Sequence, residues 1–265
     1  TEPRESICVN SASPSSFLVL VLLTLMVLQA PCRALSAVAP CPEPLTPEEW
    51  QTDPEAAPDH GFDLRPYVSG QTAAILALGG LAAAIAWNNE DPVAIQERLD
   101  RSTFDAIMDI GNAYGGGLGL GGSTLTLLAV GGFTGNDQLT SFASDLCWSY
   151  LATATFTGII KHTVDRPRPS EGGLSFPSGH TSSAFSAVPI VFHHLGWQAG
   201  VGATLMATAT GLGRVEEKCH YLSDVLFGAA IGLAVGDAVI RGKHRGAGAS
   251  GLSMAPRGIT YRMRF

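Results

Sequence analysis

From residue 66 onward, long apolar segments alternate with short polar turns. The apolar segments predict helices near 71–88, 111–134, 142–160, 181–194, 197–213 and 221–240. Strand-type alternation is scarce before the last residues. We therefore expect an all-α fold, a bundle of about six core helices with an N-terminal leader and an extended C-terminal tail. A glycine-rich run at 115–122, inside the second segment, is interpreted as a kink or a close helix contact.

The ends of the chain differ from this helical region, residues 66–241. Residues 1–39 contain a charge-free apolar run, too short to span a membrane comfortably and followed by small residues, which predicts an export signal cleaved near residue 37 or 39. An uncleaved anchor is the alternative. Residues 40–65 are rich in Pro and acidic residues and are interpreted as a linker. In the tail, 242–265, a period-2 pattern over 259–265 predicts a strand against the bundle rather than an outer-membrane address.

Composition excludes some classes of function. Hydrophobic residues make up 46% of the chain and charged residues 15%, with a net charge of −7. An acidic chain without a basic stripe argues against a nucleic-acid partner. The 5 cysteines have neither CxxC nor metal-type spacing, which argues against a zinc site.

Chemistry-bearing side chains gather at predicted helix ends. Lys161, Arg166 and Arg168 follow the third helix, the run Pro177-Ser178-Gly179-His180 opens the fourth, and Arg214, His220 and Asp224 lie between the fifth and the sixth. In an up-down bundle these ends share one face. The topology therefore predicts a single cationic site.

Such a site suits a phosphate group. Backbone N–H groups at Ser178 and Gly179 precede a helix and can bind an anion. Lys161 supplies a point charge, and the guanidinium forks of Arg168 and Arg214 can each hold two oxygens. His220 and Asp224 are four residues apart, so the carboxylate can fix the imidazole tautomer while His220 attacks phosphorus. His180 can then protonate the leaving alkoxide, and no metal is needed.

The spacing resembles the three-part motif of the type 2 phosphatidic acid phosphatase (PAP2) and vanadium haloperoxidase superfamily. The matching residues are Lys161…Arg168-Pro169, Pro177-Ser178-Gly179-His180 and Gly213-Arg214…His220…Asp224. The resemblance implies that His220 is the nucleophile, His180 the general acid and Asp224 the residue that orients His220. It implies that Lys161, Arg168, Ser178, Gly179 and Arg214 hold the phosphate, and that neither a cofactor nor a metal takes part.

The chain departs from the family pattern near the motifs. Gly213 stands where the family usually has Ser, and only seven residues separate Pro169 from Pro177. Glu216 and Glu217 are expected to face solvent or to pair with Lys218. Arg166 is expected to touch phosphate, to pair with Asp165 or to face solvent. His193 and His194 are interpreted as surface residues.

The resemblance implies a metal-independent phosphatase that acts on phosphate esters through a phosphohistidine, with lipid phosphates or diphosphates as preferred substrates. The alternative is a soluble periplasmic acid phosphatase acting on small phosphomonoesters. A vanadium haloperoxidase and a non-catalytic envelope protein are less favoured. We expect export to the cell envelope and contact with a membrane. Segments such as the one containing Asp145 are poorly suited to spanning, however, and six spans after an export signal would place the site in the cytoplasm.

Overall fold

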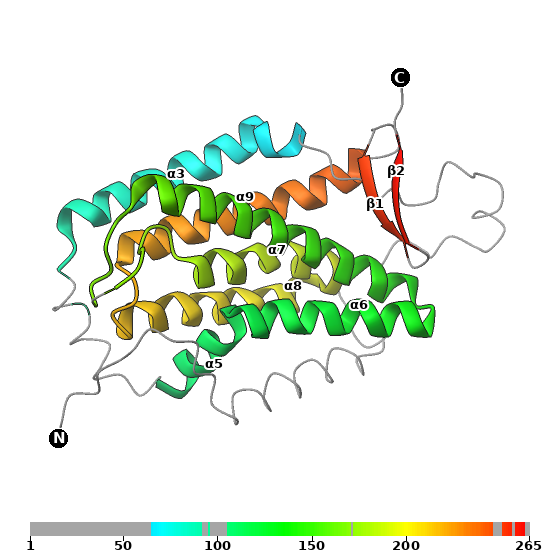
Figure 1. Cartoon of the computed structure of the whole chain (residues 1–265), viewed down its shortest axis with the longest axis horizontal. Helices are drawn as coiled ribbons and strands as arrows, with labels where there is room; N and C mark the ends of the chain where they lie inside the picture. The colour runs from blue at the N-terminus through cyan, green and yellow to red at the C-terminus, as the bar shows by residue number, and fades with distance from the viewer. Residues whose placement is uncertain are drawn as a thin grey trace.

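The computed structural model describes residues 65–91, 95, 105–170, 172–245, 251–255 and 258–262. The predicted leader and the linker up to residue 64 lie outside these ranges. The all-α bundle is confirmed (Figure 1). Its elements are η2 (Arg65–Val68), α3 (Gly70–Asn89), α5 (Asp105–Gly115), the π-helical turn η3 (Gly117–Gly121), α6 (Gly122–Thr134), α7 (Asp137–Val164), α8 (Gly179–Glu216), α9 (Leu222–Arg245), β1 (Gly251–Ala255) and β2 (Gly258–Arg262).

Helix α8 is a helical hairpin that corresponds to two predicted helices. Its chain turns at Gly196, where φ is 83° and ψ is 179°, a left-handed φ that glycine adopts without strain. The two arms pack on each other, because Ala184 and Val188 share a core cluster with Ala207. The predicted break between 194 and 197 is therefore confirmed, and it returns the end of α8 to the level of its start.

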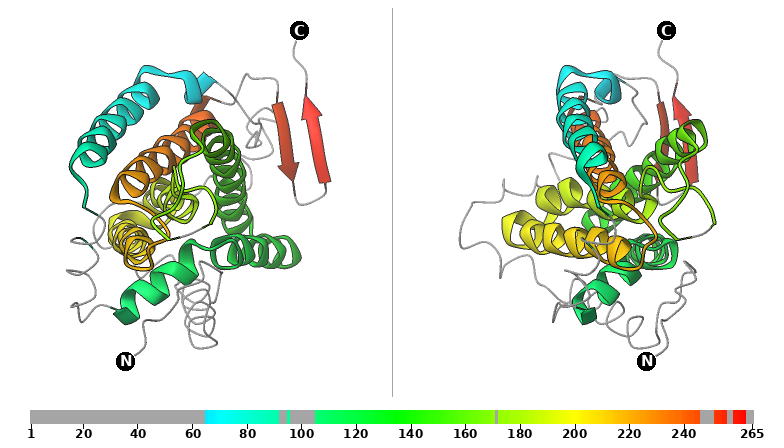
Figure 2. Two further views of the ribbon diagram at one scale, coloured as in Figure 1. Left: turned by 60° about the vertical axis from the view of Figure 1, so that its left-hand side comes forward. Right: turned by 90° about the vertical axis from the view of Figure 1, so that its left-hand side faces the viewer.

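Helix α9 runs through the middle of the bundle and packs against α8, α3 and α7 (Figures 1 and 2). Its glycines allow a close approach to the first arm of α8: a Cβ at Gly232 would collide with the Ser182 carbonyl, and one at Gly236 with the Ser186 carbonyl. Helix α9 also extends to Arg245, four residues beyond the expected domain boundary. The helix that begins at the site is thus fixed along its length.

Helix α3 lies on the outside of α9 (Figure 2). At the far end from the site, Arg241 of α9 donates to Ser69 Oγ at 2.6 Å and to Thr72 Oγ1 at 2.8 Å. Nearby, Gln71 donates to Asp237 at 3.0 Å. The two antiparallel helices are therefore tied together where α3 begins.

The glycine-rich run forms a bend, as predicted. Residues Met108–Gly115 and Gly119–Thr134 meet at 60° across η3. On the other side of the bend, Gly111 of α5 accepts a hydrogen bond from Thr210 Oγ1 at 2.5 Å. A Cβ at Gly111 would lie 2.6 Å from the Thr210 nitrogen, so the glycine also allows α5 to approach α8 closely.

The C-terminal tail contains an antiparallel hairpin rather than a single strand. Strand β2 pairs with β1 in the register Leu252↔Tyr261 and Met254↔Ile259, and Figure 1 shows the pair to one side of the helices. Residues 259–262 form a strand, as predicted, but this strand pairs with β1 instead of lying alone against the bundle. Residues 263–265 lie outside the described ranges. The expected fold omitted the partner strand because 251–255 is short, with only Leu252 and Met254 as large apolar residues.

The distribution of side chains is unlike that of a soluble bundle. Buried helical positions are mostly Ala, Ser and Thr, whereas many large apolar side chains are exposed, among them Leu78 at 70%, Phe133 at 93% and Leu205 at 66%. Small residues inside and large apolar ones outside are typical of helices packed in a lipid environment. Among the described residues, Gly70–Asn89 and Leu222–Gly242 are long and apolar enough to cross a membrane, and the bent pair Met108–Gly115 and Gly119–Thr134 is a third candidate.

Candidate functional site

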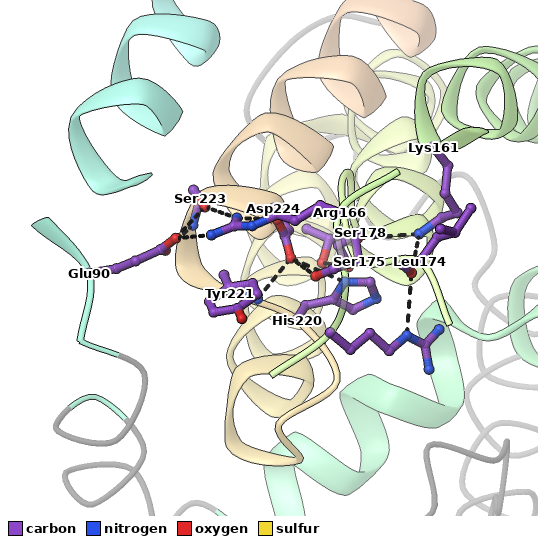
Figure 3. Close-up of polar contacts among 12 residues, drawn as sticks. Glu90, Lys161, Arg166, Leu174, Ser175, Ser178, His220, Tyr221, Ser223 and Asp224 are labelled. Carbon is purple, nitrogen blue, oxygen red and sulfur yellow. Dashed lines mark hydrogen bonds and ion pairs between the residues drawn. The ribbon is translucent and has the colours of Figure 1, made fainter. Parts of the chain in front are cut away.

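The predicted convergence of helix ends is present in the structure. The end of α7, both ends of α8 and the start of α9 meet at one end of the bundle (Figures 1 and 3). Thr181, at the start of α8, lies close enough that a Cβ on Gly211, near its end, would be 3.5 Å from the Thr181 methyl group. The Ser178 amide donates to the Asp224 carbonyl at 3.0 Å. The second and third motifs are therefore in direct contact.

His220 and Asp224 form the buried centre of the site. Asp224 is fully buried and His220 is 3% exposed. His220 Nδ1 faces Asp224 Oδ2 at 3.6 Å, slightly beyond hydrogen-bond length, so a small closure would form the bond. Asp224 Oδ2 also accepts from the Tyr221 amide at 2.8 Å and from the Ser175 hydroxyl. With Nδ1 turned to Asp224, Nε2 is the nitrogen left for chemistry.

Lys161 and Arg168 are held by one short loop. Lys161 Nζ donates to the carbonyls of Leu174 and Ser175 at 3.1 and 3.2 Å, and Arg168 Nε donates to Leu174 at 3.3 Å (Figure 3). The loop is closed by a bridge between Pro167 and Leu174. Neutral carbonyls position these cations without neutralising them, which keeps their charge available for an anion.

Burial and the neighbouring cations shift the pKa values of the two histidines and of Lys161. Burial lowers the pKa of His180 to about 3, assisted by Arg214, His220, Arg168 and Lys161. Burial likewise lowers the pKa of His220 to about 4; Lys161 and Arg214 lower it further, while Asp224 opposes the shift. The pKa of Lys161 falls to about 8 through burial and Arg168. Both imidazoles are therefore neutral near pH 7, as a nucleophilic His220 requires.

Arg214 is fixed by an acidic residue. Its Nη1 pairs with Glu217 Oε2 at 2.7 Å, and Glu217 Oε1 accepts from Asn112 of α5 at 2.7 Å. The expectation that Glu217 faces solvent or pairs with Lys218 is therefore wrong, because the next helix turn places it beside Arg214. Arg214 Nε is buried without a hydrogen-bond partner among the described residues. The guanidinium thus keeps a donor for an oxyanion.

Gly213, the departure from the family pattern, is explained by Asn112. A Cβ at Gly213 would lie 2.8 Å from both Nδ2 and Oδ1 of Asn112. The family's Ser would therefore displace the amide that holds Glu217. Asn112 comes from a helix outside the three motifs, so the motif spacing contained no signal for it.

Gly213→Ser should lower the unfolding free energy by about 1–3 kcal/mol, because the new side chain overpacks this contact. In an Asn112→Ala background the same serine should cost less than about 0.5 kcal/mol. Thermal or denaturant unfolding of the four proteins in detergent measures both steps. Equal costs of the serine in the two backgrounds would contradict this explanation.

Ser178 is placed differently from a simple phosphate ligand. Its amide donates a hydrogen bond to the backbone carbonyl of Asp224, and its hydroxyl lies 2.9 Å from Thr181 Oγ1. The residue is fully buried. The hydroxyl can still donate to a phosphate while it accepts from Thr181, whereas the amide is already engaged. Gly179 begins α8, and the use of its amide to bind phosphate stays a prediction.

Two of the three places expected for Arg166 from the sequence are wrong. Its guanidinium binds Glu90, Ser223 and Asp224, so neither a pairing with Asp165 nor a position in solvent is correct. Glu90 and Ser175 are the polar neighbours of Asp224 and Arg166 that sequence reasoning missed. Ser175 lies two residues before the second motif. Glu90 lies 76 residues from Arg166, and no local pattern connects the two.

His194 also differs from its prediction. It is half-buried, and its Nε2 lies 2.7 Å from Asp145 Oδ2, whereas a surface position was expected. Asp145 is therefore compensated by a partner across α7 and α8, which explains how an acidic residue is accommodated in an apolar segment. His193 is exposed, as predicted.

Comparison with known proteins agrees with the motifs. Residues 142–245 match the PAP2 superfamily, a range that contains every predicted site residue. A lipid A 1-phosphatase from Porphyromonas gingivalis is 33% identical over 42% of this chain and 26% of its own length. Lipid phosphate phosphatase 2 from Arabidopsis thaliana is 31% identical over 34% of this chain and 46% of its own length. The chain thus spans less than half of either relative.

The fold comparison gives the same result. The crystal structure of a transmembrane PAP2-type phosphatidylglycerolphosphate phosphatase from Bacillus subtilis superposes with a TM-score of 0.55 and 21% sequence identity, over 69% of this chain and 98% of that chain. At this identity the likeness concerns the fold alone. The family match agrees with the convergence of the three motifs on one face: residues 142–245 of this chain match the PAP2 superfamily, and they carry all three motifs.

Proposed function

We propose that this protein is a metal-independent phosphatase that hydrolyses phosphate esters through a phosphohistidine on His220. The observation that carries the proposal is a buried, neutral imidazole that faces a carboxylate inside a cluster of Lys161, Arg168 and Arg214. The cations offset the charge of a phosphoryl group, and phosphoryl transfer depends mainly on positioning and charge stabilisation. The Asp224 carboxylate leaves His220 Nε2 as the attacking atom.

The reaction has two steps, transfer of the phosphoryl group to His220 and hydrolysis of the phosphohistidine. Nε2 of His220 forms a bond to phosphorus as the ester P–O bond breaks. The proton that a monoanionic ester carries into the site passes through His180 to the leaving oxygen. A water molecule then attacks phosphorus, the P–N bond breaks, and the water proton passes to His180. Inorganic phosphate leaves and His220 is regenerated. Throughout, Asp224 accepts from Nδ1–H of His220 and stabilises the charge that develops on the ring.

The substrate class proposed is a lipid phosphate or lipid diphosphate. The two relatives reported above are named for lipid A and for lipid phosphates, and the exposed apolar surface provides a place for acyl chains. Two apolar helices support a membrane-associated protein. Export to the cell envelope remains part of the proposal. A soluble periplasmic enzyme that prefers small phosphomonoesters is the alternative.

The pKa values predict an acidic optimum. Below about pH 4 His220 becomes protonated and loses its lone pair. The pKa of His180 is about 3 in the empty site, so the proton for the leaving group must enter with a monoanionic ester, whose second pKa is about 6. For a phosphomonoester, kcat/KM should therefore fall below about pH 4 and above about pH 6. A kcat/KM that rises from pH 6 to pH 8 would contradict this assignment of proton donors.

The test of the proposed function is phosphate release, with EDTA present, from phosphatidic acid, a polyprenyl diphosphate and p-nitrophenyl phosphate in parallel. Faster turnover of either lipid is expected. Faster turnover of the small ester would favour the soluble-type alternative. No release from any ester, or a loss of activity in EDTA that divalent metal restores, would contradict the proposal.

A further inference from the structure

Arg166 is enclosed between two aromatic rings next to the site. Its guanidinium carbon lies 3.6 Å from the centroid of the Trp87 ring and 3.8 Å from that of Tyr221. The side chain is 12% exposed. Rings on both faces leave only the edge of the guanidinium for polar contacts, and these contacts define what Arg166 does.

The edge of Arg166 joins two buried carboxylates. Nη1 donates to Asp224 Oδ1 at 2.8 Å and Nη2 donates to Glu90 Oε1 at 2.7 Å (Figure 3). The side chains of Glu90 and Asp224 are only 4% and 0% exposed. Buried carboxylates with a shared guanidinium depend on it for charge compensation. The polar groups of Arg166 are therefore used to bind these two carboxylates rather than to bind phosphate.

Glu90 fixes the start of the helix that carries Asp224. Glu90 Oε2 accepts from the Ser223 amide at 3.0 Å, and Oε1 accepts from the Ser223 hydroxyl at 2.8 Å. Ser223 is the second residue of α9, where backbone amides lack partners within the helix and a negative charge is favourable. Glu90 follows directly after α3 and therefore caps a helix that begins 132 residues later in the sequence.

Asp224 is consequently held from two sides. Arg166 engages Oδ1, while Oδ2 receives Ser175 and the Tyr221 amide and faces His220 at 3.6 Å. Without Arg166 the carboxylate would keep its contacts at Oδ2 but lose its ionic partner at Oδ1, so its rotation would be less restricted. The orientation of His220 would then be less well defined by Asp224.

We propose that Glu90 and Arg166 are a pair of positioning residues that hold Asp224 in register with His220, and that α3 is thereby a required part of the catalytic unit. This inference rests on the proposed function. Glu90 and α3 lie outside the region that matches the PAP2 superfamily, 142–245. Helix α3 is tied to α9 at both ends, by Glu90 at the site and by Gln71 and Arg241 at the opposite end, so its two attachments can be tested separately.

The experiment compares kcat and KM of the full chain in detergent with those of Glu90→Gln, Arg166→Met and the double variant. We expect kcat to fall about 10-fold in Glu90→Gln and about 100-fold in Arg166→Met, with KM changed less than about 3-fold, because the phosphate ligands are untouched. The double variant should be no slower than Arg166→Met, since both residues act through Asp224. Arg166→Lys should recover only part of the loss, because one ammonium group cannot replace the planar fork.

Gln71→Ala is the matched control, because it removes an α3–α9 hydrogen bond at the end remote from the site. It should leave kcat within about 2-fold of the wild type. If Arg166→Met fails to fold, the kcat and KM of the near-isosteric Glu90→Gln variant are sufficient to test the inference. An active wild type with Glu90→Gln no slower than Gln71→Ala, or with its loss confined to KM, would overturn the inference. A wild type that releases no phosphate would overturn the proposed function, and this inference with it.

Discussion

His220→Ala is expected to reduce phosphate release by about 10⁴-fold or more, the largest effect of any single substitution in this protein. No other described side chain combines a neutral imidazole with a facing buried carboxylate at the cationic cluster. Water attacking the ester directly would receive none of the assistance that Asp224 gives to the ring. The loss should appear in kcat, since the phosphate ligands remain. Initial rates of phosphate release from phosphatidic acid measure it.

His162→Ala is the control for this experiment, because His162 is an exposed histidine on α7. It should retain the activity of the wild type. Far-UV circular dichroism and thermal unfolding should show that His220→Ala keeps its helical fold. A folded His220→Ala with more than about one tenth of the wild-type kcat would contradict a nucleophilic role for His220.

His180→Asn is expected to show the second-largest effect, and the effect should depend on the leaving group. An alkoxide leaving from a lipid phosphate needs a proton, so its release should slow by about 10²–10⁴-fold. The p-nitrophenolate ion is stable without a proton. The first turnover of p-nitrophenyl phosphate should therefore stay within about 10-fold of the wild type, while later turnovers slow because His180 no longer activates water.

Rapid mixing distinguishes these two phases. His180→Asn should give a burst of p-nitrophenol equal to the enzyme concentration, followed by slow release. Equal losses for the lipid ester and for the p-nitrophenyl burst would mean that His180 does not act as the general acid, and that its role is to bind phosphate or to support the fold.

Much of the fold follows from the sequence, for physical reasons. Helices α7, α8 and α9 could be located because long apolar segments end at polar loops. The break in α8 could be predicted because Gly196 separates two such segments. The β1–β2 pairing could not be predicted, since strand pairing depends on a partner that carries little pattern of its own. The inside-out distribution of large apolar residues was equally hidden, because hydropathy alone does not show which face of a helix is exposed.

The candidate site was predictable where chemistry and spacing coincide. Lys161, Arg168, Arg214 and the two histidines gather as expected, because the up-down topology brings their helix ends to one face. The contacts of Arg166 and Glu217 were not predicted. Arg166 contacts Glu90, which follows α3, and Glu217 contacts Asn112 of α5; both partners lie outside the motifs. Such long-range partners are set by tertiary packing, which a single sequence does not encode in any local pattern.

The measurement that tests the account most directly is the identification of the phosphoenzyme. The protein is quenched in alkali during turnover of a lipid phosphate, and the phosphorylated peptide is mapped by mass spectrometry. The account predicts an alkali-stable, acid-labile phosphate on His220 that is absent from His220→Ala. With p-nitrophenyl phosphate as the substrate, the same phosphate should be more abundant in His180→Asn, because it forms without a proton from His180 and is hydrolysed slowly. Phosphate on another residue, or steady turnover with no phosphorylated protein at any time, would contradict it.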